Sequence, residues 1–155
     1  MKILVIGGNR FVGKKLVTKL LNQSHKVTVL NRSGSGPNGS KKIKFDRNIE
    51  EHYDYIDFNK YDCVVDMCLF KPEQFKLIKN KISDNINYIF VSSGAVDYID
   101  TNSFGDYAIE KMEVEKEISQ IDENLERKKT LYREYDDGKN VLRSAMKDFI
   151  GGGII

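Results

Sequence analysis

Ile3–Gly13 reads ILVIGGNRFVG, and the pattern of this segment limits the fold classes open to the chain. Ile3–Ile6 is a short apolar run with β-branched residues, and it predicts a buried strand that ends at Gly7. From Phe11 to Asn22 apolar residues recur at helical spacing, which predicts a helix directly after the glycines. A glycine turn between a strand and a helix presents free backbone N–H groups, to which phosphate groups bind.

This turn matches most of the G-x-G-x-x-G pattern that binds the pyrophosphate of a dinucleotide. Gly7 or Gly8 permits the tight turn, and Gly13 lets the helix lie close to the strand. Arg10 replaces the middle glycine, and its side chain either covers a pyrophosphate as a cation or obstructs its approach. A glycine-rich turn with a purely structural role is the alternative. We expect a dinucleotide to be bound by the following residues of the turn: Gly7, Gly8, Asn9, Arg10, Phe11, Val12 and Gly13.

The rest of the chain alternates between strand and helix patterns. Further strands are predicted at Lys26–Leu30, Lys42–Phe45, Tyr61–Leu69 and Ile86–Val91. Helices are predicted from Pro72 to about Ile82 and from Phe104 to about Tyr135, a loop at Arg32–Ser40, and either a helix or an irregular crossover at Ile49–Phe58. This alternation predicts an α/β fold, a doubly wound parallel sheet with helices on both faces. Ligands of such sheets bind at the carboxyl ends of the strands, here near Gly7, Asn31, Asp46, Cys68 and Ser93.

The end of the second predicted strand bears on which dinucleotide is bound. An acidic residue there would bind the hydroxyl groups of the adenosine ribose in NAD. The chain has Asn31-Arg32-Ser33 instead, and Arg32 can pair with the 2′-phosphate of NADP. The alternative is a solvated arginine in a loop. NADP is therefore the preferred cofactor, with NAD as the second choice.

Three further residues lie at the ends of later strands. Asp46 either accepts a hydrogen bond from the amino group of an adenine or caps the next helix. Arg47 follows it, and Cys68 ends the predicted strand Tyr61–Leu69. We expect Asp46, Arg47 and Cys68 to contact the cofactor as well.

Ser93, Tyr107 and Lys111 are the candidate catalytic residues. The spacing Tyr-x-x-x-Lys places both side chains on one face of a helix. A phenol has a pKa of about 10, and a neighbouring ammonium group favours its ionised form. Such a pair can move a proton to or from an alcohol or carbonyl oxygen that a serine hydroxyl holds, while hydride passes to or from a nicotinamide. A surface Tyr and Lys on a polar helix are the alternative.

Composition excludes several other classes of protein. The chain has 155 residues, enough for one domain, and a net charge of +2, which gives no reason to expect a nucleic-acid partner. Its apolar runs are shorter than the roughly 18 residues of a membrane span. Cys63 and Cys68 do not have the spacing of a disulfide framework or a zinc site, and we expect no metal. A reducing, cytoplasmic location is the simplest interpretation.

In these residues the chain resembles the extended short-chain dehydrogenase/reductase superfamily, in its NAD(P)-dependent epimerase/dehydratase branch. The resemblance covers residues 1 to about 118, and the matching segments are Ile3–Gly13, Val27–Arg32, Tyr61–Asp66, Val91–Val96 and the pair Tyr107 and Lys111. It implies a Rossmann-like fold and a bound nicotinamide dinucleotide. It also implies that Tyr107 is the acid/base residue, that Lys111 lies on the nicotinamide ribose and that Ser93 orients the substrate. Substrates in this branch are typically nucleotide sugars, and the family often dimerises through the helix that bears the tyrosine, so a homodimer is expected.

The chain also departs from the family pattern. The interval from Ser93 to Tyr107 is short, and Asp97 stands where a tyrosine is usual. We expect an NAD(P)-binding domain at residues 1–120, a charged helix and atypical tail at 121–155, and no substrate-binding C-terminal half. Asn140–Arg143 is interpreted as a remnant of the sixth strand.

Two functions follow from these features. The first is an NAD(P)-dependent epimerase, dehydratase or oxidoreductase. The second is an NAD(P)-binding regulatory or sensor module without turnover, or a remnant of a longer enzyme.

Overall fold

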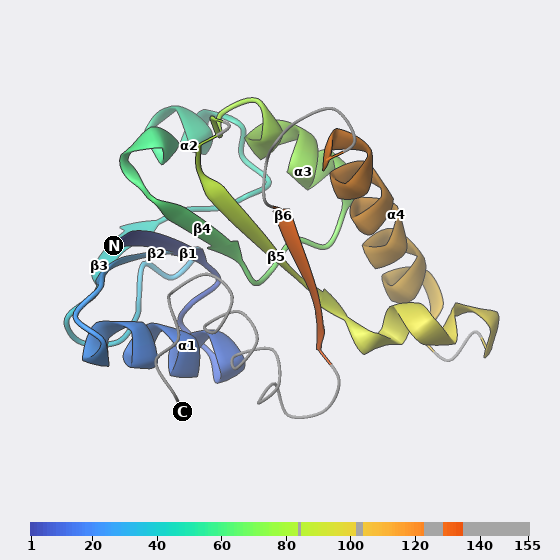
Figure 1. Ribbon diagram of the computed structural model, residues 1–155, viewed down its shortest axis with the longest axis horizontal. Helices are drawn as coiled ribbons and strands as arrows, with labels where there is room; N and C mark the ends of the chain where they lie inside the picture. Colours follow the sequence, from blue (N-terminus) through green and yellow to red (C-terminus); the bar gives the residue numbers. More distant parts are fainter. Residues whose placement is uncertain (84, 102–103, 123–128, 135–155) are drawn as a thin grey trace.

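The computed structural model describes residues 1–83, 85–101, 104–122 and 129–134. In this part of the chain the strands form one parallel sheet in the order β3-β2-β1-β4-β5-β6 (Figure 1). The strands are β1 (Lys2–Ile6), β2 (Lys26–Asn31), β3 (Lys41–Lys44), β4 (Cys63–Asp66), β5 (Asn87–Ser93) and β6 (Lys129–Glu134). The sequence order reverses between β1 and β4, so the α/β, doubly wound prediction is confirmed.

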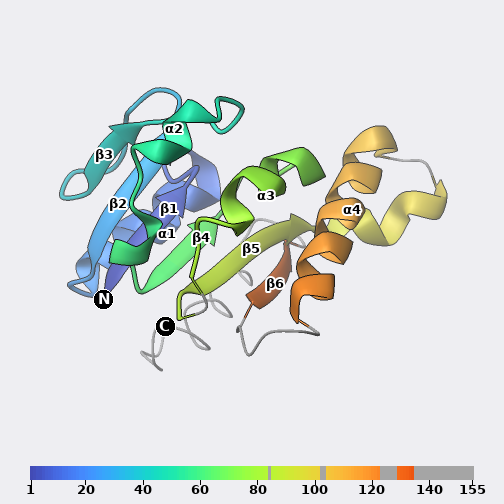
Figure 2. The same cartoon turned by 90° about the horizontal axis from the view of Figure 1, so that it is seen from above.

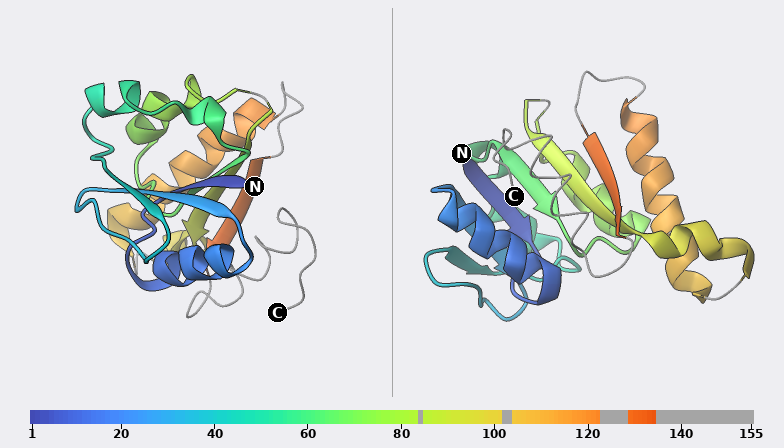
Figure 3. Two further views of the ribbon diagram at one scale, coloured as in Figure 1. Left: turned by 90° about the vertical axis from the view of Figure 1, so that its left-hand side faces the viewer. Right: turned by 60° about the horizontal axis from the view of Figure 1, so that its bottom comes forward.

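Helices cover both faces of the sheet. They are α1 (Phe11–Asn22), α2 (Glu51–Asp54), α3 (Pro72–Lys79) and α4 (Gly105–Asp122), with 3₁₀ segments η1 (Phe58–Lys60) and η2 (Gly94–Thr101). In Figure 1 α1 lies on one side of the sheet and α2, α3 and α4 on the other, and Figure 3 shows the same two layers from other directions. Helix α1 connects β1 to β2 over one face, whereas α2, α3 and α4 belong to the later connections, from β3 to β4, β4 to β5 and β5 to β6, over the other face.

Alternate residues along each buried strand supply two separate cores. Ile3 and Val5 of β1 face α1 and pack with Leu16, Val17 and Leu20 of that helix. Leu4 and Ile6 face the opposite side, where the core includes Phe75 and Ile78 of α3 and Val114 and Ile118 of α4. Strands that are apolar on both faces are typical of a parallel sheet between two helical layers.

The structure corrects the predictions for the second half of the chain. The helix predicted from Phe104 to about Tyr135 is wrong in its extent, because α4 ends at Asp122 and Lys129–Glu134 is strand β6, which pairs in parallel with β5 (Figure 2). The helix predicted to about Ile82 ends at Lys79. The sixth strand therefore precedes Asn140–Arg143, and that segment lies outside the described residues. Charged residues fill exposed helices and edge strands alike, so composition did not separate α4 from β6.

For Ile49–Phe58 the sequence predicts either a helix or an irregular crossover, and the structure contains both. A four-residue helix, α2, is followed by an irregular stretch and then by the 3₁₀ segment η1. Tyr53 of α2 and Phe58 of η1 are both buried and stacked with ring centroids 6.3 Å apart. The crossover therefore has little regular secondary structure, but two of its aromatic side chains are buried in the core.

The first turn brings α1 unusually close to the end of β1. A Cβ atom on Gly13 would lie 2.6 Å from the carbonyl oxygen of Gly7 and 3.1 Å from Cα of Gly8. Gly7 itself has a φ of +92°, in the region that favours glycine. Backbone therefore rests on backbone here, which confirms the packing role predicted for Gly13.

A buried ion pair joins the ends of β3 and β4. The guanidinium of Arg47, just after β3, donates to both carboxylate oxygens of Asp66, at 2.9 Å and 2.7 Å. Asp66 also accepts from the hydroxyl of Tyr88 on β5 at 3.0 Å, and the carbonyl of Arg47 accepts from the hydroxyl of Tyr53 at 2.9 Å. Burial alone would lower the pKa of Arg47, but the Asp66 carboxylate raises it above its ordinary value, so the guanidinium stays charged.

We predict that Gly13→Ala lowers the free energy of unfolding by about 1–3 kcal/mol, the usual cost of overpacking a close contact. Alanine is the better helix former, so only the clash with Gly7 explains a loss. Lys15→Ala on the exposed side of α1 is the matched control and should be nearly neutral. Urea unfolding measures both, and a Gly13→Ala variant as stable as the wild type would contradict the close contact.

We predict that Asp66→Asn costs about 3–5 kcal/mol, because it leaves the buried guanidinium of Arg47 without its counter-charge. The same change at Asp57, whose carboxylate forms an exposed pair with Lys60 at 3.1 Å, should cost no more than about 1 kcal/mol. Thermal or urea unfolding of the two variants compares them directly. Equal losses would show that the buried pair is not the stronger constraint.

Candidate functional site

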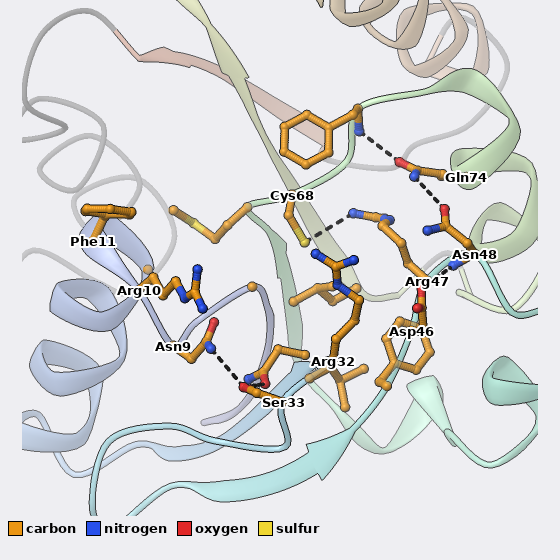
Figure 4. A pocket seen from close by; sticks show the side chains of 18 of the residues that line it. Asn9, Arg10, Phe11, Arg32, Ser33, Asp46, Arg47, Asn48, Cys68 and Gln74 are labelled. Atoms are coloured by element: carbon orange, nitrogen blue, oxygen red, sulfur yellow. Dashed lines mark hydrogen bonds between the residues drawn. The ribbon is translucent and has the colours of Figure 1, made fainter.

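A pocket of about 630 Å³ opens at the carboxyl ends of β1, β2 and β4 (Figure 4). The sequence-predicted residues that line it are Gly7, Asn9–Gly13, Asn31, Arg32, Asp46, Arg47 and Cys68. These come from four separate segments, which the sheet order brings together at the point where the strand sequence reverses. The structure thus places most of the predicted cofactor residues around one cavity.

Gly8 is the member of the glycine turn that does not line the pocket. A Cβ atom there would lie 2.7 Å from Cγ2 of Val17 and 3.0 Å from Cγ1 of Val5. Gly8 is buried between α1 and β1, so it serves the packing of the helix rather than the surface of the cavity.

Phe11 begins α1 at the edge of the pocket in an unusual conformation. Its φ is +41°, in a region that bulky side chains rarely adopt, and its side chain is 86% exposed. Arg10 precedes it as the N-cap residue with extended backbone and no side-chain cap bond. Both residues line the pocket, and the side chain of Arg10 does not cap the first amides of α1.

A network of neutral polar groups links the glycine turn to the end of β2. The amide of Asn9 donates to the hydroxyls of Ser33 at 3.1 Å and Ser35 at 3.3 Å. Ser33 donates to Oδ1 of Asn31 at 2.7 Å, and Figure 4 shows the bond between Asn9 and Ser33. The end of β2 thus carries bonded amide and hydroxyl groups at the place where an acidic residue would stand in an NAD-binding site.

The basic residues of the pocket differ in their partners. Both terminal nitrogens of Arg47 are bound to Asp66, and the residue is buried. Arg10 and Arg32 are exposed and form no ion pair within the described ranges, and Figure 4 shows both side chains within the cavity region. The uncompensated positive charge in the pocket therefore belongs to Arg10 and Arg32.

Asp46 lies half-buried at the pocket wall. Its Oδ1 accepts from the backbone N–H of Asn48 at 3.0 Å, which closes a turn. It does not cap α2, because the N-cap of that helix is Glu50. Of the two interpretations of Asp46, the helix cap is thus wrong, and a contact with the ligand stays a prediction.

Cys68 lines the pocket, with its Sγ 3.4 Å from Nη1 of Arg47. Burial raises the pKa of this thiol to about 11, so it stays protonated near neutral pH. Both Cys63 and Cys68 are free. Cys68 therefore contributes a protonated thiol to the cavity wall and is not activated as a nucleophile.

The candidate catalytic residues lie beside the pocket but do not line it. Ser93 ends β5, and its hydroxyl accepts from the backbone N–H of Ala95 at 3.2 Å. Tyr107 is 39% exposed in the first turn of α4, whereas Lys111, one turn later, is 2% exposed. The Nζ of Lys111 donates to the carbonyl of Val91 at 3.2 Å, and burial lowers the pKa of this ammonium to about 8.

The side chains of the cavity wall that sequence reasoning missed include Asn48, Met67, Phe70 and Gln74. Gln74 accepts from the backbone N–H of Phe70 at 3.0 Å and donates to Asn48 at 2.9 Å, a bond drawn in Figure 4. Phe70 directly follows the strand predicted at Tyr61–Leu69, which was a usable signal, since ligands bind at the ends of strands. Nothing in the sequence pairs Gln74 with Asn48, which are 26 positions apart.

Two further observations limit the site. The described residues contain no group of three or more His, Cys, Asp or Glu side chains that could hold a metal ion. No helix in the described part of the chain is long and apolar enough to cross a membrane.

Solved structures with the same fold come from several bacteria. A putative NAD-dependent epimerase/dehydratase from Methylobacillus flagellatus is 22% identical, with a TM-score of 0.69 over 94% of this chain and 59% of that one. The UDP-Glc/GlcNAc 4-epimerase of Campylobacter jejuni is 17% identical, with a TM-score of 0.69 over 85% and 52% of the two chains. A short-chain dehydrogenase/reductase superfamily protein from Agrobacterium tumefaciens with bound NAD is 16% identical, with a TM-score of 0.68 over 86% and 48%.

The chain thus spans about half the length of these proteins. A comparison with curated protein sequences found no significant match. The family model described as the NAD dependent epimerase/dehydratase family matches residues 3–102, which include the glycine turn, the pocket wall and Ser93. The chain therefore belongs to the NAD dependent epimerase/dehydratase family.

Proposed function

We propose that the chain binds a nicotinamide adenine dinucleotide in the pocket at the ends of β1, β2 and β4. The observation that carries this proposal is the cavity itself, which is built on the glycine turn and has Arg10 and Arg32 as its uncompensated charges. A volume of about 630 Å³ is within the range of cofactor sites. The pyrophosphate would lie against the turn from Gly7 to Gly13, where Gly13 lets α1 lie close to the end of β1.

NADP is the preferred cofactor in this proposal. The end of β2 offers Asn31, Arg32 and Ser33 and no carboxylate to the adenosine ribose. A carboxylate would repel a 2′-phosphate, whereas a guanidinium forms strong charge-assisted hydrogen bonds with it. The hydroxyls of Ser33 and Ser35 add donors near Arg32, and Asp46 remains available for the adenine amino group.

The reaction class that fits the site is proton transfer coupled to hydride transfer. The nicotinamide, when bound, supplies the hydride donor or acceptor. Tyr107 would exchange a proton with an alcohol or carbonyl oxygen, and Ser93 would hold that oxygen. With a pKa of about 8, Lys111 is mostly charged near neutral pH, which favours the phenolate of a tyrosine close by.

Nucleotide sugars are the substrate class we propose, since several structural relatives are named as UDP-sugar epimerases, one of them solved with UDP-glucose. A second function is favoured by one observation: Ser93, Tyr107 and Lys111 lie outside the pocket lining. That arrangement suits a cofactor-binding regulatory or sensor module without turnover. The homodimer expected from the resemblance would use α4 and stays a prediction.

We predict that the protein binds NADPH and that Arg32→Ala weakens this binding by about 1.5–3 kcal/mol, the range for a hydrogen bond to a charged group. NADH binding should change little, because NADH lacks the 2′-phosphate. Calorimetry or nicotinamide fluorescence measures both cofactors, and Lys15→Ala is the control for removing one positive charge. Equal losses for the two cofactors would reject the NADP preference, and no binding of either by the wild type at millimolar concentration would reject the proposed function.

We predict that any turnover depends on Tyr107. Tyr107→Phe removes only the hydroxyl, so it should leave cofactor affinity nearly unchanged while lowering the rate by a factor on the order of 10² or more. Tyr55→Phe, at a side chain that is 80% exposed, is the matched control. Orientation of the substrate can supply roughly 7–11 kcal/mol of barrier reduction. Since the chain spans about half the length of its structural relatives, we expect it to hold nucleotide sugars poorly and to turn them over slowly. Undiminished activity of Tyr107→Phe, or rapid turnover by the wild-type chain, would contradict these expectations.

A further inference from the structure

Phe70 contacts both parts of the site, which otherwise lie apart. Its side chain lines the cavity, although 39% of it remains exposed. Its ring centroid is 6.2 Å from that of Tyr107, and the Nζ of Lys111 lies over the ring at 4.8 Å from the centroid. One aromatic side chain therefore stands between the dinucleotide pocket and the Tyr107–Lys111 pair.

The ammonium of Lys111 is held between two rings. Its Nζ lies 4.8 Å from the centroid of Phe70 and 4.8 Å from that of Phe90, and it donates one hydrogen bond to the carbonyl of Val91. The negative face of an aromatic ring attracts a cation. Phe90 belongs to β5 and is fully buried, so Phe70 is the half of this pair that a ligand can reach.

The segment around Phe70 is fixed at both ends. On the α4 side, Lys71 forms an ion pair with Glu110 at 3.0 Å, one residue before Lys111. On the pocket side, the backbone N–H of Phe70 donates to Gln74, which in turn donates to Asn48. These contacts hold the ring in one place relative to α4 and to the cavity wall.

We propose that Phe70 is a positioning residue that joins the cofactor pocket to the catalytic pair. Its ring holds the Lys111 ammonium and the Tyr107 ring in place, and its exposed part forms the wall that the nicotinamide end of the dinucleotide meets. The second half of this inference rests on the proposed function, whereas the first concerns only the protein.

The first test measures the titration of Lys111 in the protein without cofactor. NMR of protein with ¹³C-labelled lysine follows this side chain, and Lys111→Met assigns its signal. Phe70→Leu keeps the site apolar but removes the ring face that favours the charged ammonium, so the pKa of Lys111 should fall by about half a unit or more. Phe70→Tyr keeps the ring and should restore the wild-type value.

The charged and titratable groups that act on Lys111 are Asp66, Arg47, Cys68 and Glu115, and none of them is altered by these substitutions. Tyr55→Leu, which removes an exposed aromatic side chain elsewhere, controls for a general effect and should leave the titration unchanged. An unchanged or raised pKa of Lys111 in a folded Phe70→Leu variant would overturn the positioning role. Thermal unfolding of each variant confirms that it is folded.

The second test compares NADPH with 2′-phospho-ADP-ribose, which is the same molecule without the nicotinamide. Phe70→Leu should weaken NADPH binding about threefold to tenfold, the size of one aromatic contact, and leave binding of 2′-phospho-ADP-ribose unchanged. Equal losses for both ligands, or no loss for NADPH, would overturn the nicotinamide contact. If the wild type binds neither ligand, the proposed function and the nicotinamide contact fail together, and the titration of Lys111 decides the positioning role by itself.

Discussion

The buried ion pair between Arg47 and Asp66 is the constraint on which the site depends. It joins the ends of β3 and β4 across β1 and β2, and it reaches β5 through Tyr88 and α2 through Tyr53. Removing two opposite charges from water is costly unless they are well bonded, and here both carboxylate oxygens and both terminal nitrogens of Arg47 have partners, whereas Nε of Arg47 has none among the described residues. The pair fixes one wall of the pocket, and it leaves the attraction of anions to Arg10 and Arg32.

Much of the fold could be predicted because buried parallel strands are continuous apolar runs and because glycine marks the first turn. The pocket followed from the same pattern, since ligands of such sheets bind at strand ends. Strand β6 could not be predicted, because Lys129–Glu134 is as charged as the helix before it and its place depends on hydrogen bonds to β5. Arg47 was expected to contact the cofactor, but its buried partner, Asp66, lies inside an apolar strand, where nothing in the sequence marks it as an ion pair.

The two halves of the site differ in how they are built. The pocket is formed by residues at strand ends that the sheet order brings together, so its geometry follows from the sheet. Tyr107 and Lys111 are carried by α4, which reaches the sheet by packing on β5 and α3. Phe70, Lys71 and their contacts are the connection between these halves. A family member that spans about half the length of its structural relatives thus has both the pocket and the helix that carries Tyr107 and Lys111.

The strand order also has a consequence for how the chain folds. β1 lies between β2 and β4, and its Ile3 pairs with Val27 on one side and with Cys63 on the other. The first pairing closes a short loop, whereas the second must bring together segments that are far apart in sequence, and such distant pairings slow folding. The β1–α1–β2 unit can therefore form early, with the glycine turn already shaped. The cavity is completed only when β4 docks, so it depends on the strand pairing with the largest sequence separation in the described sheet.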